Sequence, residues 1–212
     1  AAFKLIKSVA GKDVHLRTAI GGQHQYPYWT LQYANNAPSV DIIAVASYFF
    51  GDLNERTSQH DALKLLFAPD PGFLKDTLNE IAPSNRPIAS YEINMHTTHG
   101  TATEEERNEL VAAMVSGSAL AKHLLENISL GIQPSMVFTF SQFDTSTDNH
   151  QSVKLWGITR DLSPTLRFRP TGLAVKMLNS ILGGNYHSVQ MNSSSLIWTV
   201  AAFSGPKIWH GV

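Results

Sequence analysis

The stretch that decides the fold is Arg86–Gly100, which reads RPIASYEINMHTTHG. Its first half is a short apolar run, Ile88–Tyr91, and that run ends in a single acid, Glu92. Three side chains that can form hydrogen bonds follow within the next seven residues: Asn94, His96 and His99. The pattern predicts a buried strand over residues 86–93 that delivers one carboxylate to a polar loop.

Strands and helices alternate on either side of this stretch. We expect further strands over residues 14–20, 41–50 and 135–140, and the run 41–50 (DIIAVASYFF) is apolar throughout. Continuous apolar strands are typical of a parallel sheet that is covered on both faces. Helical spacing predicts helices over residues 2–9, 28–34, 58–67, 71–81, 103–129 and 170–181. Thr103 and Glu106 have the spacing of a capping box at the start of the longest helix.

The pattern changes after the last predicted helix. Residues 186–190 and 196–202 are typical of two strands, and residues 208–209 fit a third. We therefore divide the chain into a partial barrel domain over residues 1–183 and the start of a β-sandwich-like element over residues 184–212.

The order of the elements indicates an α/β fold with parallel strands. Four strand–helix units are present, whereas a closed barrel needs eight over roughly 250 residues. An open sheet, a dimer of half barrels and a piece of a longer chain would each account for four units. The helical start and the short β tail favour the piece of a longer chain.

Composition excludes several classes of protein. The 212 residues contain no cysteine, so disulfides, thiolate metal sites and a cysteine nucleophile are excluded. The formal net charge is −1 and no basic stripe is present, which argues against a nucleic-acid partner. No apolar run reaches the roughly 20 residues of a membrane span. No phosphate-binding loop or esterase elbow occurs.

Four segments together resemble a known group of enzymes: VASYFFGD, ASYEIN, VFTFSQFD and the closing passage KLWGITRDLSPTLRFRPTGLAVKMLN. They are similar to the C-terminal half of the catalytic (β/α)8 barrel of clan A retaining glycoside hydrolases. The resemblance is to the cellulase, arabinofuranosidase and xylosidase-like families that append a β-sandwich. It implies strands five to eight of the barrel, with hydrolysis of O-glycosyl bonds in plant-type poly- or oligosaccharides as the activity.

The resemblance also implies roles for individual residues. ASYEIN is similar to the seventh strand, whose terminal acid is the nucleophile, and this points to Glu92. VASYFFGD is similar to the sixth strand, where an aromatic residue contacts the nucleophile, and this points to Tyr48. At the end of the eighth strand, where the families place a stacking tryptophan, this chain has Phe138, Phe140 and Gln142.

Retaining hydrolysis needs a second carboxyl group as acid/base. The resemblance places it on a strand that would precede Ala1, so we expect a missing N-terminal half to supply it. Asp52 and Asp144 are the only local substitutes, and we interpret both as turn-capping residues rather than as the missing acid, because aspartate favours such positions. The alternative function is a non-catalytic half barrel that binds carbohydrate or assembles as a homodimer.

The remaining candidates for substrate binding are polar or aromatic residues near strand ends: His24, Asn94, His96, Gln142 and Trp156. Trp156 is the tryptophan best placed to stack on a sugar. His96 and His99 lack further ligands nearby, so we predict no metal and no other cofactor. The expected partners are a carbohydrate and either the other barrel half or a second copy. An extracellular or periplasmic location follows from the resemblance alone.

Overall fold

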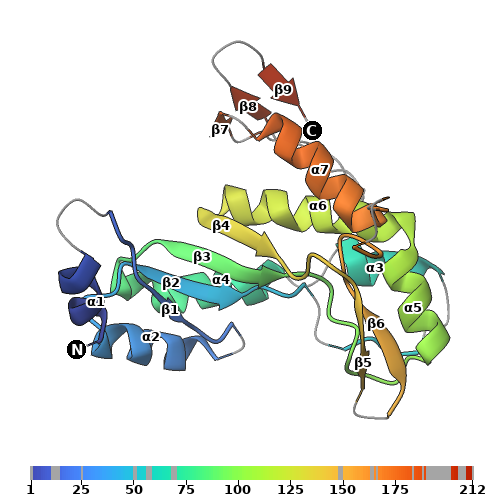
Figure 1. Ribbon diagram of the computed structural model, residues 1–212, viewed down its shortest axis with the longest axis horizontal. Coiled ribbons are helices and arrows are strands. Elements are labelled where there is room, and N and C mark those ends of the chain that lie inside the picture. The colour runs from blue at the N-terminus through green and yellow to red at the C-terminus, as the bar shows by residue number, and fades with distance from the viewer. Residues whose placement is uncertain are drawn as a thin grey trace. The chain divides into compact units, whose positions relative to one another are not determined.

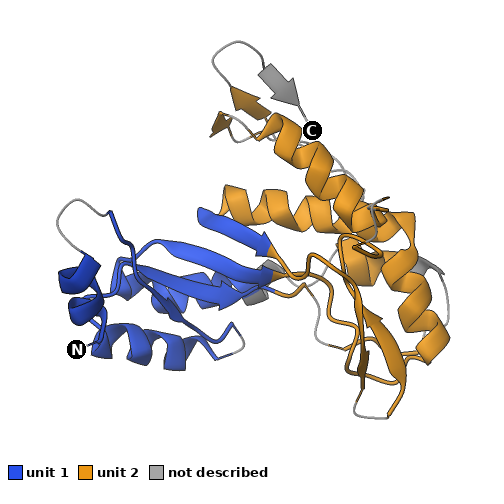
Figure 2. Cartoon of the chain, viewed as in Figure 1, with its two compact units in different colours: residues 1–47, 70–92, 131–136 blue, residues 48–69, 93–130, 137–212 orange. Residues whose placement is uncertain are grey.

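The computed structural model describes residues 2–10, 15–24, 26–49, 52–55, 59–67, 71–147, 150–162, 165, 167–182, 184–187, 189, 202–204 and 209–211 (Figure 1). The chain forms two compact units (Figure 2). Unit 1 contains residues 1–47, 70–92 and 131–136, and unit 2 contains residues 48–69, 93–130 and 137–212. The predicted boundary between residues 183 and 184 stays a prediction.

A four-stranded sheet forms the centre of unit 1. Its strands are β1 (Ala19–Gly21), β2 (Ile42–Ala46), β3 (Ile88–Ile93) and β4 (Ile132–Val137), in the order β1-β2-β3-β4. β1 pairs with β2 and β2 with β3, both in parallel. Figure 1 shows β4 beside β3 and pointing in the same direction. The sequence-based expectation of a parallel α/β sheet is therefore confirmed.

Helices cover this sheet. Unit 1 contains α1 (Ala2–Ala10), α2 (Pro27–Asn36), α4 (Pro71–Ile81) and the short 3-10 helix η1 (Ala82–Ser84). The core between sheet and helices contains Ala34, Ile43, Val45 and Ile81, none of which is exposed. Val45 and Ile43 come from the apolar run that the sequence marks as a doubly covered strand, and their complete burial agrees with that interpretation.

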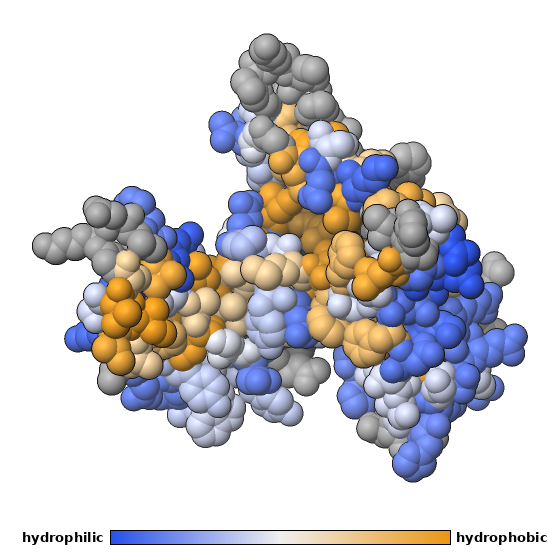
Figure 3. Space-filling model, viewed as in Figure 1, coloured by the Kyte–Doolittle hydropathy of each residue, from blue (hydrophilic) through white to orange (hydrophobic). Residues whose placement is uncertain are grey.

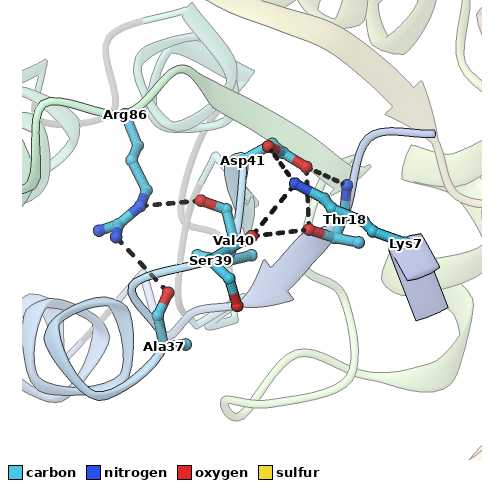
Figure 4. A network of polar contacts seen from close by, with 7 residues as sticks. All are labelled: Lys7, Thr18, Ala37, Ser39, Val40, Asp41 and Arg86. Atoms are coloured by element: carbon cyan, nitrogen blue, oxygen red, sulfur yellow. Dashed lines mark hydrogen bonds and ion pairs between the residues drawn. The ribbon is translucent and has the colours of Figure 1, made fainter. Parts of the chain in front are cut away.

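The carboxylate of Asp41 ties α1 and the residue before β1 to the start of β2 (Figure 4). It accepts hydrogen bonds from Lys7 Nζ at 2.6 Å, from Thr18 N at 2.7 Å and from Thr18 Oγ1 at 2.9 Å. The Lys7 hydrogen bond, followed by those from Thr18, lowers the pKa of Asp41 to about 2. Arg86 Nε donates to Val40 O at 3.0 Å and adds a contact just before β3.

Unit 2 is built on helices packed around one apolar cluster. The helices are α3 (Gln59–Phe67), α5 (Glu104–Ala112), α6 (Met114–Ser129) and α7 (Pro170–Ile181). Two antiparallel sheets accompany them: the hairpin β5 (Phe143–Ser146) with β6 (Ser152–Leu155), and β7 (Asn185–His187), β8 (Ala202–Ser204) and β9 (Trp209–Gly211). Phe203 of β8 is 2% exposed and belongs to the main cluster, so the tail packs on unit 2. Most of the strand expected over residues 196–202 lies outside the described residues.

The hairpin β5–β6 was not expected from the sequence, which shows a polar segment there. Buried Val153 and Leu155 alternate with exposed Lys154, because successive side chains of a strand point to opposite faces. Lys154 and Asp144 lie opposite each other and form an exposed ion pair at 3.3 Å. Asp144 is therefore part of a strand, and the interpretation of it as a turn residue is wrong.

The helix expected over residues 103–129 is two helices. The capping box at its start is confirmed, because Thr103 and Glu106 exchange both hydrogen bonds. The helix ends at Ala112, and Ala113 adopts an extended conformation with φ −69° and ψ 143°. The hydroxyl of Ser116 donates to Leu110 O, a carbonyl near the end of α5. The sequence pattern hides this break because apolar residues continue at helical spacing on both sides of it.

Three strands differ in extent from their predictions. The strand expected over residues 41–50 is β2, which ends at Ala46, and the described residues 47–49 are not in a strand. The strand expected over residues 14–20 is described only as β1, and the one expected over residues 135–140 lies earlier, over Ile132–Val137. Residues 138–142 instead form an irregular segment. Within it, Phe140 O accepts a hydrogen bond at 2.9 Å from the amide of Thr159, a residue further along the chain. Among the described residues, no helix has the length and apolar character to cross a membrane.

We predict that Gly117→Ala destabilises the protein, although alanine is the better helix former. A Cβ at position 117 would lie 2.4 Å from Pro170 O, at the point where α6 meets α7. The helices would have to separate, at a cost of about 1–3 kcal/mol in unfolding free energy. Urea unfolding measures the change. Ser118→Ala, at an exposed position of the same helix, is the matched control, and an unchanged midpoint for Gly117→Ala would contradict the close approach.

Candidate functional site

The backbone of Glu92 is fixed at the end of the pairing between β3 and β2. Val45 lies opposite Ser90, and the next residue of β2, Ala46, lies opposite Glu92. Tyr91 is therefore an extra residue in β3, a β-bulge, which is a feature that re-aims the side chains beside it. Glu92 O accepts from Ser47 N at 2.8 Å and from Ser90 Oγ at 3.0 Å. The half-buried carboxylate of Glu92 thus extends from a strand end held on two sides.

A pair of serines supports this strand end from inside unit 1. The hydroxyls of Ser47 and Ser90 lie 2.7 Å apart, and both residues are buried. Tyr91 is 39% exposed, and its pKa is raised by partial burial and then by the negative charge of Glu92. The carboxylate of Glu92 therefore acts electrostatically on its immediate surroundings.

Unit 2 gathers five rings into what we call the aromatic–histidine cluster: Tyr48, His96, His99, Phe138 and Trp156. The rings of His96 and His99 stack with centroids 4.7 Å apart, and Tyr48 meets His96 edge-on at 5.6 Å. Trp156 lies 5.3 Å from Tyr48 and 6.2 Å from Phe138. The structure therefore brings together three residues that the sequence proposed separately for substrate binding, namely Tyr48, His96 and Trp156.

Two residues that were predicted to contact the substrate have buried side chains. Asn94 is completely buried, and its amide donates to Phe138 O at 2.7 Å and to Trp156 O at 3.2 Å. Trp156 is 4% exposed, and its Nε1 donates to Thr97 Oγ1 at 2.6 Å. A buried amide and a buried indole support the loops around the cluster, but in this arrangement neither presents a surface to a sugar.

Arg107 holds the loop that carries His96 and His99, and the sequence analysis missed it. Its side chain is completely buried, and burial lowers its pKa. The guanidinium donates to five acceptors: the carbonyl oxygens of Thr97, His99, Gly100 and Ala102, and Oε1 of Gln151. A signal was present, because positions 107, 110 and 111 share the buried face of α5 at helical spacing.

The remaining candidate site residues differ in exposure and in their contacts. Gln142 is half-buried, and its Oε1 accepts a hydrogen bond from Arg169. Phe140 is 57% exposed. Asp52 is exposed. Among the described residues, no group of three or more histidine, aspartate or glutamate side chains has an arrangement suited to a metal ion.

His24 lies in unit 1 and is buried. Its Nδ1 is 3.1 Å from Thr77 Oγ1, and the same hydroxyl donates to His24 O at 2.9 Å. Because the hydroxyl has one hydrogen, His24 Nδ1 is then the donor to Thr77. Burial lowers the pKa of His24 to about 4, so the ring is neutral in the folded protein near pH 7. These contacts are at odds with the predicted position of His24 in a substrate cleft.

The residues offer two kinds of chemistry. A half-buried carboxylate at a strand end is suited to nucleophilic attack or to proton transfer. Imidazole and phenol groups beside apolar rings are suited to binding polar ligands that also have apolar faces. Glu92 is the last residue of the stretch 70–92 of unit 1, and the aromatic–histidine cluster belongs to unit 2.

Comparison with solved structures shows a related fold. A GH39 β-xylosidase from Caulobacter crescentus is 16% identical and superimposes with a TM-score of 0.53, over 96% of this chain and 41% of its own. A GH39 enzyme from Xanthomonas axonopodis pv. citri is also 16% identical, with a TM-score of 0.56 over 96% of this chain and 38% of its own. The chain thus has the fold of part of these barrels and spans about two-fifths of their length. The sequence matches no protein-family model and no curated protein.

We expect Arg107→Lys to destabilise unit 2, because one ammonium group is unable to replace five fixed donors. Carbonyl oxygens left unpaired in the interior should lower the unfolding free energy by about 2–4 kcal/mol. Urea unfolding followed by circular dichroism measures the loss. Arg160→Lys, at an exposed position, is the control and should be neutral. Equal midpoints for both variants would show that Arg107 does not hold the loop.

The buried neutral state of His24 predicts that stability falls in mild acid. The unfolded chain binds a proton near the ordinary pKa of 6.5, whereas the folded protein resists it until about pH 4. Stability should therefore decrease as the pH drops from 6.5 to about 4, by about 3 kcal/mol in total. His24→Gln should flatten this dependence in urea unfolding at several pH values, and His15→Gln, at an exposed position, should retain it. An equal slope in all three proteins would assign the acid sensitivity to other groups.

Proposed function

We propose that the chain is the nucleophile-bearing half of a retaining glycoside hydrolase. Glu92 attacks the anomeric carbon, while an acid/base carboxyl group from a preceding half of the barrel protonates the departing oxygen. The covalent glycosyl-enzyme is then hydrolysed by water, which the same acid/base deprotonates. The two carboxyl groups would lie about 5–5.5 Å apart, as retention of configuration requires.

One observation carries this proposal. Glu92 is a half-buried carboxylate at the carboxyl end of a parallel strand, and the sheet belongs to a fold shared with part of two GH39 structures. In (β/α) barrels the catalytic groups lie at the carboxyl ends of the strands. The hydrogen bonds from Ser47 and Ser90 to Glu92 O support the role, because a nucleophile needs a fixed backbone.

Tyr48 and His96 are proposed to assist the reaction at Glu92. Tyr48 follows β2 two residues after Ala46, which lies opposite Glu92. A phenol donating to the Glu92 carboxylate would keep it ionised for attack. His96 and Gln142 would bind sugar hydroxyls. The substrate class is a β-linked plant-type poly- or oligosaccharide, and a β-xyloside is the first probe because one solved relative in fold is described as a β-xylosidase.

The surface of α1 supports a protein partner. Leu5, Ile6 and Val9 are 64%, 47% and 78% exposed, and Figure 3 shows apolar surface at the end of unit 1 that carries α1. β1 is an edge of the described sheet, and an edge offers unpaired backbone groups. The preceding half of the barrel would cover both features and bring the acid/base.

The same surface favours the second candidate function, a non-catalytic half barrel that binds carbohydrate or assembles as a homodimer. A second copy could cover α1 as well as a preceding half could. Intact mass and sedimentation velocity separate the candidates. A dimer of 23.3 kDa chains without hydrolysis supports the second function, and a longer chain that carries another carboxyl group supports the first.

Glu92→Gln should abolish hydrolysis of an aryl β-xyloside while leaving the fold intact. Removal of the covalent route should lower kcat by at least about 10³-fold. The assay uses the chain as its gene encodes it, with any residues that precede Ala1. Glu80→Gln, at an exposed position of α4, is the matched control. Wild-type turnover by Glu92→Gln would remove Glu92 from the mechanism.

A chemical rescue separates the two carboxylate roles. In Glu92→Ala, added azide should attack the anomeric carbon directly and give a glycosyl azide of inverted configuration, because the space of a nucleophile has been opened. A product of retained configuration would instead assign Glu92 as the acid/base.

A further inference from the structure

We propose that His123 joins α6 to the end of α3 by a contact that exists only while both of its ring nitrogens carry a proton. We call this contact the His123 link. Nε2 lies 2.8 Å from Leu66 O, in the last turn of α3, and Nδ1 lies 2.8 Å from Glu126 Oε2. His123 is 5% exposed, so water has little access to the ring. The link thus connects two helices of unit 2 through a buried titratable group.

The chemical identity of the two partners fixes the protons. A carbonyl oxygen accepts hydrogen bonds and does not donate them, so Nε2 must carry a hydrogen toward Leu66 O. A neutral imidazole has one N–H, and Nδ1 would then turn a lone pair toward the carboxylate of Glu126 at 2.8 Å. Two acceptors in this position repel each other, so the observed distance needs a hydrogen between them. The pair of His123 and Glu126 therefore holds one proton more than a neutral ring beside a carboxylate.

Lys122 favours the ring as the place of that proton. Its Nζ lies 2.5 Å from Glu126 Oε1, one turn further along α6. Burial raises the pKa of Glu126, but the hydrogen bonds from His123 and Lys122 outweigh burial, and the pKa lies below its ordinary value. The carboxylate is therefore ionised near neutral pH, and His123 forms an ion pair with it as an imidazolium.

Two further contacts of the ring suit a positive charge. Leu66 O belongs to the last turn of α3, where carbonyl oxygens lack helical partners and the helix dipole favours cations. The ring of Phe49 is stacked on the imidazole, with centroids 4.1 Å apart and an interplanar angle of 17°. The face of an aromatic ring attracts a cation. Both contacts weaken when the imidazole becomes neutral.

The other charged groups on the elements around the ring face the solvent. α6 has no charged or titratable residue besides Lys122, His123 and Glu126. Among the described side chains, the charged residues of α3 and of the segment after Phe49 are exposed: Asp61, Lys64, Asp52 and Glu55. The proton of His123 is therefore the one to which the link responds.

The link reaches the aromatic–histidine cluster through Phe49. Phe49 N donates to Asn94 O at 3.2 Å, and the preceding residue, Tyr48, belongs to the cluster. When the proton leaves, Nδ1 and the carboxylate of Glu126 repel each other, and Phe49 loses part of its support. Unit 2 is thus held more tightly at acidic than at alkaline pH. This property goes beyond the proposed hydrolysis, because it needs neither Glu92 nor a sugar.

Urea unfolding at about pH 6.5 and at about pH 8.5 tests the link. The folded state uses a proton that the unfolded chain releases near the ordinary histidine pKa of about 6.5, so stability is lost as the pH rises. Between the two pH values, the unfolding equilibrium constant of the parent should increase by at least about fivefold relative to that of His123→Gln. His15→Gln, at an exposed position, is the matched control and should behave as the parent does.

Glu126→Gln should also lose the pH dependence. An amide N–H is able to donate to Nδ1 of a neutral ring, so the contact no longer requires the second proton. Nitrogen-15 NMR of the histidine rings in the unaltered parent is independent of whether the variants fold. At about pH 6.5 both ring nitrogens of His123 should give the signals of a protonated imidazolium.

Two results would overturn the proposal. One is an NMR signal of Nδ1 that shows a free lone pair in the folded parent at this pH. The other is the same change of the unfolding constant with pH in the parent and in His123→Gln. Loss of hydrolysis in Glu92→Gln is a separate result, because the variants of His123 and Glu126 leave Glu92 in place.

Discussion

Parallel pairing of β2 with β3 is the interaction on which the rest of the structure depends. It sets Ala46 opposite Glu92 after a one-residue bulge, and it directs the backbone hydrogen bond from Ser47 N to Glu92 O. Without the bulge at Tyr91 the alternation of the strand would be shifted by one residue, and the carboxylate would point to the other face. The buried contact between the hydroxyls of Ser47 and Ser90 reinforces this register from within.

In the loop that follows β3, hydrogen bonds of buried polar groups hold the backbone in place, a role that apolar packing has elsewhere in the protein. Arg107 donates to four carbonyl oxygens of one loop, and Asn94 and Trp156 each form hydrogen bonds inside the protein. An irregular loop leaves backbone carbonyls without partners, and a buried one must find donors for them. Because a guanidinium has five donors in a fixed plane, a single side chain is sufficient. The loop that carries His96 and His99 is therefore shaped by residues that do not face the solvent.

The exposed aliphatic side chains of α1 support the proposal of a protein partner for unit 1. Aliphatic side chains on α1 fit a protein partner, and the chain spans about two-fifths of the length of the two GH39 structures that share its fold. The likeness in fold supports hydrolysis, and a β-xyloside as the first probe, as proposals, while the proposed protein partner rests on the exposed side chains of α1.

The sequence by itself determined the α/β order of the elements, the parallel sheet, the capping box at Thr103 and the position of Glu92 at a strand end. These features follow from local periodicity and capping, which neighbouring residues in the chain encode. Only the tertiary structure decided that Ala113 breaks a helix, that a hairpin follows β4, and that Arg107, Asn94 and Trp156 are buried. Burial of a polar or aromatic side chain depends on partners far away in the chain, such as Phe138 O for Asn94 and Thr97 for Trp156. No local pattern records such partners, because the free energy of burying a polar group is set by whether they are present.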